Sequence, residues 1–173
     1  MRVIGGEFRR RLLKSVPGLD TRPTPDRLRE ALFNILAPRI EGASFADLYA
    51  GTGAAGIEAL SRGARSVLFV ESNPAAVSVI RQNLKSLGAD ARAEVRQGKA
   101  TMFARKVDAE IVFLDPPYGL EREYETVLGL LGESNARLVI VQHEVRTKLA
   151  ASYGSLAHMR TVRQGDNCLS FFS

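Results

Sequence analysis

The sequence predicts an α/β fold with a mostly parallel sheet, and two observations carry that prediction. From Ser44 to residue 142, short apolar runs typical of strands alternate with longer stretches of helical periodicity. Such alternation places helices on both faces of a parallel sheet. The last two apolar runs, 156–162 and 168–172, are joined by the turn residues 164–167, so they must pair antiparallel. The sheet is therefore expected to end in a hairpin.

Each element follows from its own local pattern. Strands are expected at 44–49, 66–71, 91–96, 109–114 and 137–142, which together with the hairpin make seven. Helices are expected at 54–62, 74–87, 99–105 and 121–132. An earlier helix is expected to begin with Thr24 as N-cap and Pro25 at its first position, and to end at Pro38.

The net charge of +5 comes entirely from the first 40 residues. They contain nine Lys and Arg against four Asp and Glu, whereas residues 41–173 contain fifteen of each. The pattern predicts a basic hairpin or arm over 1–23, ahead of a nearly neutral domain over 24–173. Such an arm fits a polyanionic partner, although a solvated arm without a partner has the same composition. The candidate contacts are Arg9, Arg10 and Arg11 of the arm, with Arg27 and Arg29 of the first helix.

Composition excludes several classes of protein. A 173-residue chain that is 45% apolar and 25% charged is typical of a single globular domain. No apolar run reaches the ~18 residues of a membrane span, and the N-terminus lacks an apolar signal core, so we expect a cytoplasmic protein. The single Cys168 excludes a disulfide framework and is expected in the core. His143 and His158 lack the neighbours of a catalytic triad or a metal site, and no metal is expected.

The segment that follows the first strand has the composition of a cofactor-binding turn. Asp47 and the residues up to Ala50 lead directly into Gly51-Thr52-Gly53-Ala54-Ala55-Gly56. Glycines in such a turn let a ligand approach the backbone at the beginning of a helix. Glu71 ends the second strand, 20 residues after Gly51, where a carboxylate can accept the hydroxyls of a ribose.

Taken alone, these residues also match a dinucleotide fingerprint, so an NAD(P)-dependent oxidoreductase is an alternative. Two features favour S-adenosylmethionine instead. Asp47 suits an amine-bearing ligand better than a pyrophosphate, and the chain has no second domain for a hydride substrate. A tight turn without a ligand remains the simplest alternative. The predicted cofactor residues in this region are Asp47, Tyr49, Ala50, Gly51, Thr52, Gly53, Glu71 and Ser72.

A second motif follows the buried strand that ends at Leu114. It is Asp115-Pro116-Pro117-Tyr118, and Pro116 cannot continue the ladder of hydrogen bonds. An acid, a bare carbonyl and an aromatic ring thus meet at the carboxyl end of a core strand, where open α/β sheets bind ligands. These groups are suited to hold a planar amine such as a nucleobase. Asp115, Pro116, Pro117 and Tyr118 are therefore the predicted catalytic residues.

Together, the two motifs resemble those of class I S-adenosylmethionine-dependent methyltransferases that act on amino groups. More narrowly, nearly the whole chain resembles the RsmD family of bacterial 16S ribosomal RNA guanine-N2 methyltransferases. The resemblance lies in the segments 2–6, 22–36, 47–64, 69–71, 114–118 and 165–167. It implies a Rossmann-like fold, and a monomer that acts on 16S rRNA within the small ribosomal subunit or an assembly intermediate.

The resemblance also indicates how the residues act, and it leaves alternatives. Asp115 and the Pro116 carbonyl would accept the amine's hydrogens, and Tyr118 would stack on the base. Many relatives hold the adenine amine with an acid after the third strand, where this chain has Lys99, so the amide of Ala100 is expected to contact the ring. An adenine-N6 methyltransferase would more often carry Asn at position 115 and a larger recognition domain. A catalytically inactive RNA-binding domain is the third alternative.

Overall fold

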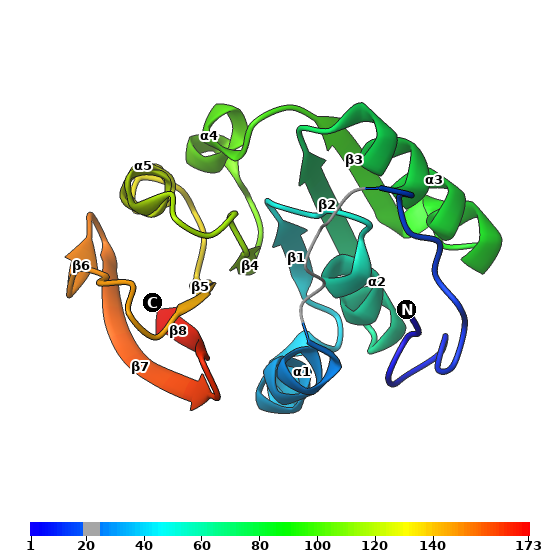
Figure 1. The fold of residues 1–173 in the computed structure, drawn as a ribbon, viewed down its shortest axis with the longest axis horizontal. Helices are drawn as coiled ribbons and strands as arrows, with labels where there is room; N and C mark the ends of the chain where they lie inside the picture. The colour runs from blue at the N-terminus through cyan, green and yellow to red at the C-terminus, as the bar shows by residue number, and fades with distance from the viewer. Residues whose placement is uncertain (19–24) are drawn as a thin grey trace.

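The structure, a computed structural model, describes residues 1–18 and 25–173. Its centre is a mixed sheet in which the strands are ordered β3-β2-β1-β4-β5-β8-β7-β6 (Figure 1). The strands are β1 (Ser44–Asp47), β2 (Ser66–Glu71), β3 (Ala93–Gln97), β4 (Ile111–Leu114), β5 (Leu138–Glu144), β6 (Ser152–Tyr153), β7 (Leu156–Gln164) and β8 (Asn167–Phe172). Strands β1 to β5 run parallel and β7 pairs antiparallel with β8, as the sequence predicted. Strand β8 is also antiparallel to β5.

Helices cover both faces of the sheet and enclose two apolar layers. They are α1 (Asp26–Ile40), α2 (Ala54–Ser61), α3 (Pro74–Leu87), α4 (Ala100–Phe103) and α5 (Glu121–Leu131), with short 3-10 turns at Asp90–Arg92 and Ala104–Lys106. Helices α1, α2 and α3 lie on one side of the sheet, and α4 and α5 lie on the other (Figure 1). The first layer contains Phe45, Phe69 and Phe113, and the second contains Ala46, Val112 and Leu114. This alternation along β1 and β4 is the period of two expected for strands.

Besides shifts of one or two residues at the ends of other elements, four details differ from the sequence predictions. The sheet has eight strands rather than seven, because the two-residue strand β6 is too short to show a periodicity. Pro38 lies inside α1 instead of ending it, since Pro38 and Asn34 are both on the exposed side and the buried Ile40 completes the last turn. The third strand begins at Ala93, after a 3-10 turn, and the fourth helix ends at Phe103.

The beginning of α1 is only partly covered by the described residues. The expected N-cap Thr24 and the expected boundary between residues 23 and 24 lie outside them. Within the described part, Pro25 occupies the N-cap position and Asp26 is the first helical residue. The 74–87 helix has its expected bounds, because Asn73 caps its N-terminus and Gly88 ends it in the left-handed conformation.

The N-terminal arm, residues 1–18, packs against the body of the protein. It contains a single isolated bridge, between Arg2 and Leu12, rather than a regular hairpin. Val3, Phe8 and Leu13 are buried in the same apolar layer as α1, α2 and α3. The arm is therefore folded onto the helices, next to α2 and α3 (Figure 1). None of the helices in the described ranges is long and apolar enough to cross a membrane.

Candidate active site

Three acidic residues meet at the carboxyl edge of the parallel strands. Asp47 ends β1, where it is level with Phe69 of β2 and Phe113 of β4. Glu71 and Asp115 each follow two residues later on those neighbouring strands. Residues two apart in a strand point to the same face, so Asp47 and Glu71 belong to the face covered by α1, α2 and α3, while Asp115 comes directly after the end of β4 at the same edge. The sheet itself thus gathers the two predicted motifs into one place.

The glycine-rich turn between β1 and α2 forms the wall beside these acids. Gly51 and Gly53 have φ angles of +54° and +87°, in the region that favours glycine. A Cβ added to Gly51 would meet nothing within 4 Å, so the turn presents bare backbone to open space. A Cβ on Gly56 would instead overlap the ring of Phe69. Gly51 therefore leaves room beside the turn, while Gly56 lets α2 approach the sheet.

Asp47 is a buried carboxylate with one oxygen left unpartnered. Its side chain is 1% exposed, and its Oδ2 accepts the Gly56 N–H at 3.3 Å. Its Oδ1 is buried without a hydrogen-bond partner. Burial above all, with the negative charges of Asp115 and Glu71, raises the pKa of Asp47 to about 7. A ligand that brings a positive charge or an N–H group next to the buried Oδ1 would stabilise the ionised form of Asp47.

Glu71 connects the glycine turn to the beginning of α3. Its Oε2 accepts the Gly51 N–H at 2.8 Å, and its Oε1 accepts the Asn73 N–H, also at 2.8 Å. The carbonyl oxygen of Glu71 in turn accepts the N–H of Gly98 at 3.0 Å. This bond brings the segment before Ala100, the buried first residue of α4, next to Glu71. The residues predicted to surround an adenosine thus lie along one continuous edge.

The other predicted cofactor residues lie around this edge in different roles. Ala50 and Thr52 are buried in the turn, and the exposed Ser72 follows Glu71. The Tyr49 hydroxyl donates to Glu123 of α5 at 2.7 Å, and burial raises its pKa well above the usual range. The hydroxyl of Tyr49 therefore links the glycine turn to α5 by a hydrogen bond.

The Asp115–Tyr118 segment leaves β4 without regular secondary structure. Asp115 and Tyr118 are half-buried, Pro116 is buried and Pro117 is exposed. The Tyr118 hydroxyl donates to Oδ1 of Asn167, the first residue of β8, at 2.7 Å. The negative charge of Asp115 contributes to the raised pKa of Asp47. The second motif therefore adjoins the glycine turn, as expected from the shared sheet edge.

The three consecutive arginines of the arm are exposed, and the backbone of the arm is firmly anchored. Glu58 of α2 is fully buried and accepts the N–H groups of Ile4 and Gly5 at 2.9 and 2.8 Å. The hydroxyl of Ser61 accepts the Phe8 N–H at 2.9 Å. Both α2 residues lie in the 47–64 segment, but the sequence alone did not indicate a role for either, because their partners are distant backbone groups of the arm. The anchored backbone holds Arg9, Arg10 and Arg11 at the surface.

Of the two α1 arginines, Arg27 is exposed and Arg29 is buried. Arg29 is 1% exposed, donates to the Arg2 carbonyl at 2.7 Å and lies 3.1 Å from the Asp26 carboxylate. Burial lowers the pKa of its guanidinium. The prediction that Arg29 contacts RNA is therefore wrong for this structure, because its guanidinium holds the arm to α1.

Asn83 of α3 is a further residue that the sequence did not single out. It is 1% exposed, accepts the Lys14 N–H at 2.8 Å and donates to the carbonyl oxygens of Lys14 and Thr52, both at 3.2 Å. One side chain thus connects the arm to the glycine turn.

The described residues contain no group of three or more His, Cys, Asp or Glu that could hold a metal ion.

Comparison with known proteins places the chain in a family. A family model described as "Conserved hypothetical protein 95" matches residues 1–173. The chain belongs to this family. One relative is the Escherichia coli protein named "Ribosomal RNA small subunit methyltransferase D", 39% identical over 155 residues that cover 86% of this chain and 77% of that protein. The resemblance to the RsmD family is thereby confirmed.

Solved structures show the same fold. The structure of yhhF, an Escherichia coli protein described as a proposed methyltransferase, has a TM-score of 0.85 at 36% identity and covers 99% of this chain and 96% of that one. An RNA methyltransferase from Salinibacter ruber, in complex with S-adenosyl-L-homocysteine, has a TM-score of 0.67 at 20% identity, with 86% and 91% covered. The family member described here therefore has the Rossmann-like class I methyltransferase fold that the sequence predicted.

Proposed function

We propose that this protein transfers a methyl group from S-adenosylmethionine to the exocyclic N2 of a guanine in 16S ribosomal RNA. The observation that carries the proposal is the buried, unpartnered Oδ1 of Asp47 beside Asp115 and the open glycine turn. A methyltransferase needs its donor and its acceptor at adjacent positions, and these two motifs adjoin. The name of the Escherichia coli relative, a small-subunit rRNA methyltransferase, supports the same substrate class.

The residues present suit the cofactor. The Asp47 carboxylate would accept from the ammonium group, the backbone of the glycine turn would receive the carboxylate, and Glu71 would accept from the ribose. When bound, S-adenosylmethionine supplies an electrophilic methyl group on a sulfonium centre. Three carboxylates around the turn favour this cationic ligand. They disfavour the doubly charged pyrophosphate of NAD(P), which would lie close to the buried Asp47.

Asp115 and its neighbours would prepare the acceptor amine. The lone pair of the guanine N2 amine is delocalised into the ring, which makes the amine a poor nucleophile. If Asp115 accepts one N–H and the Pro116 carbonyl accepts the other, the nitrogen is drawn toward tetrahedral geometry and its lone pair points at the methyl group. Orientation of this kind can supply several kcal/mol. The carboxylate that already accepts the N–H can take the proton released after the transfer.

Tyr118 and the arm would hold the RNA. Stacking of the Tyr118 ring on an unstacked base is worth roughly 1–3 kcal/mol. Arg9, Arg10 and Arg11 would neutralise RNA phosphates near the target, and the anchored backbone of the arm would fix their distance from Asp115. The specific 16S substrate is proposed from the family, and the phosphate contacts from the exposed charge.

Ligand-dependent thermal unfolding tests the donor. At 100 times its Kd, a ligand that binds only the folded protein adds about 2.7 kcal/mol to stability. We expect S-adenosylmethionine and S-adenosylhomocysteine to raise Tm by roughly 5–10 °C, and NADH to leave it unchanged. Stabilisation by NADH alone would favour the oxidoreductase. Stabilisation by S-adenosylmethionine without any methyl transfer to RNA would favour the catalytically inactive domain.

A further inference from the structure

The hydroxyl of Tyr118 is tied to a strand that lies far from it in the sequence. It donates to Oδ1 of Asn167 at 2.7 Å across a separation of 49 residues. Asn167 is the first residue of β8 and immediately follows the tight turn of the β7–β8 hairpin. Both side chains are half-buried, so the bond lies at the rim of the site rather than in the core.

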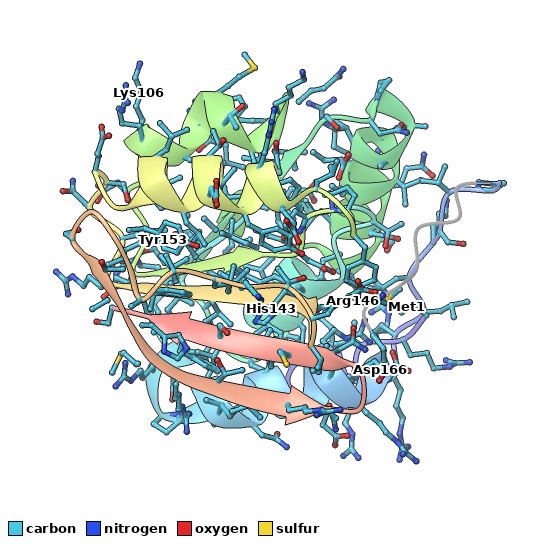
Figure 2. All side chains as sticks on the ribbon, turned by 60° about the vertical axis from the view of Figure 1, so that its left-hand side comes forward. Met1, Lys106, His143, Arg146, Tyr153 and Asp166 are labelled. Carbon is cyan, nitrogen blue, oxygen red and sulfur yellow. The ribbon has the colours of Figure 1, made fainter. Side chains whose placement is uncertain are left out.

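The acceptor of this bond, Asn167, is held in place by strands on both sides of it. Asn167 is level with Glu144 of β5 on one side and with Gln164 of β7 on the other. The turn is fixed to the end of β5, because the Val145 N–H donates to the carbonyl oxygen of Asp166 at 3.0 Å. Figure 2 shows Asp166 at the tip of the hairpin, at the same edge of the sheet as Arg146. The acceptor for Tyr118 therefore belongs to the sheet.

Tyr118 itself lies in a segment that lacks regular structure. Residues 115–120, between β4 and α5, form neither helix nor strand, and Gly119 has a φ of +81°. In such a segment, a hydrogen bond at the far end of the ring limits how the ring can turn. A phenylalanine at this position would have no group to donate to Asn167. Stacking on a base needs only the aromatic ring, whereas the hydrogen bond to Asn167 needs the tyrosine hydroxyl.

We propose that Asn167 is a positioning residue for methyl transfer, because it orients the Tyr118 ring against the target base. This rests on the proposed function of the Asp115–Tyr118 segment. Strand β8 then contributes to the acceptor site through the side chain of its first residue. Asn167 acts through Tyr118, so its effect must vanish when the hydroxyl of Tyr118 is removed.

A double-mutant cycle measured by single-turnover methyl transfer at saturating RNA tests the proposal. Loss of a single hydrogen bond of this kind predicts an about five- to tenfold slower transfer for Asn167→Ala, with an unchanged Kd for S-adenosylmethionine. Asn167→Asp keeps an acceptor and should stay within about twofold of the wild type. In a Tyr118→Phe background, Asn167→Ala should have no further effect. Asp166→Ala, in the same turn, is the matched control and should leave the rate unchanged.

A second readout does not depend on activity. The chain has four tyrosines, so NMR of ζ-13C-tyrosine protein gives few signals, and the Tyr118→Phe variant assigns the relevant one. Asn167→Ala should shift the Tyr118 signal, whereas Asp166→Ala should not. An unshifted signal, or a rate loss that persists in the Tyr118→Phe background, would overturn the positioning role. A wild-type protein that methylates no RNA would instead overturn the proposed function, while the NMR shift would still report the contact.

Discussion

The substitution Asp47→Asn should change the pH dependence of stability in a defined direction. The pKa of Asp47 is raised to about 7 in the folded protein, against a usual value of 3.8. A raised pKa means that the folded state holds the proton more tightly than the unfolded state. The contribution of Asp47 to stability is therefore greatest in acid and is lost as the pH rises to about 7.

The magnitude follows from the pKa. Between pH 5 and pH 7 the folded protein is protonated at Asp47 while the unfolded chain is ionised, which costs about 1.4 kcal/mol per pH unit. The wild type should therefore lose about 3 kcal/mol between pH 5 and pH 9 through this group. The amide introduced by Asp47→Asn keeps an acceptor for the Gly56 N–H, but its buried NH₂ group costs about 1–3 kcal/mol at every pH. The variant should be less stable than the wild type at pH 5 and of similar or greater stability at pH 9.

Urea unfolding of the ligand-free protein at both pH values gives the comparison. The difference in unfolding free energy between variant and wild type should change by about 3 kcal/mol from pH 5 to pH 9. In thermal unfolding this corresponds to a change of roughly 6–12 °C in the difference between the two Tm values. Asp108→Asn removes an exposed acid and is the matched control. A pH-independent difference for Asp47→Asn would show that the pKa of this buried carboxylate is not raised in the folded protein.

Four further predictions concern the cofactor, the acceptor amine, the basic arm and the glycine turn. Below about pH 7, the affinity for S-adenosylmethionine should increase up to tenfold for each pH unit by which the pH is raised, because the cation binds better to ionised Asp47. Calorimetry in two buffers should detect the proton that Asp47 releases on binding. Asp115→Ala should abolish methyl transfer and keep near-normal cofactor affinity; near-normal turnover would exclude the mechanism. Exchanging the arginines at 9–11 for glutamine should lower the slope of log K against log[salt] by roughly 2–3 in RNA binding, and an unchanged slope would exclude phosphate contact. Gly56→Ala should cost about 1–3 kcal/mol in urea unfolding, because its Cβ would overlap the ring of Phe69; wild-type stability would show that the helix can move away.

The parallel sheet and the two motifs could be predicted from sequence because their signals are local. Hydrophobic periodicity marks the strands, and Asn73 with Gly88 sets the bounds of α3. Asp47, Glu71 and Asp115 could be brought together without a structure, since carboxyl ends of parallel strands share an edge. The sheet order that places them on adjacent strands was then supplied by the structure.

What the sequence could not show depends on contacts between distant segments. Arg29 has the same helical neighbourhood as Arg27, and it is distinguished by contacts with distant groups such as the Arg2 carbonyl and the buried Glu58. The irregular arm gave no periodic signal, although its backbone is bonded to α2. The bond from Tyr118 to Asn167 spans two supersecondary units, so neither residue predicts the other.

The identity of the methylated nucleoside tests the proposed reaction most directly. The protein is incubated with tritiated S-adenosylmethionine and small ribosomal subunits from a strain that lacks this activity, in parallel with naked 16S RNA. The RNA is then digested to nucleosides and resolved by mass spectrometry. We expect N2-methylguanosine as the labelled nucleoside, and none with the Asp115→Ala variant. N6-methyladenosine, or no incorporation into either RNA, would contradict the proposed reaction.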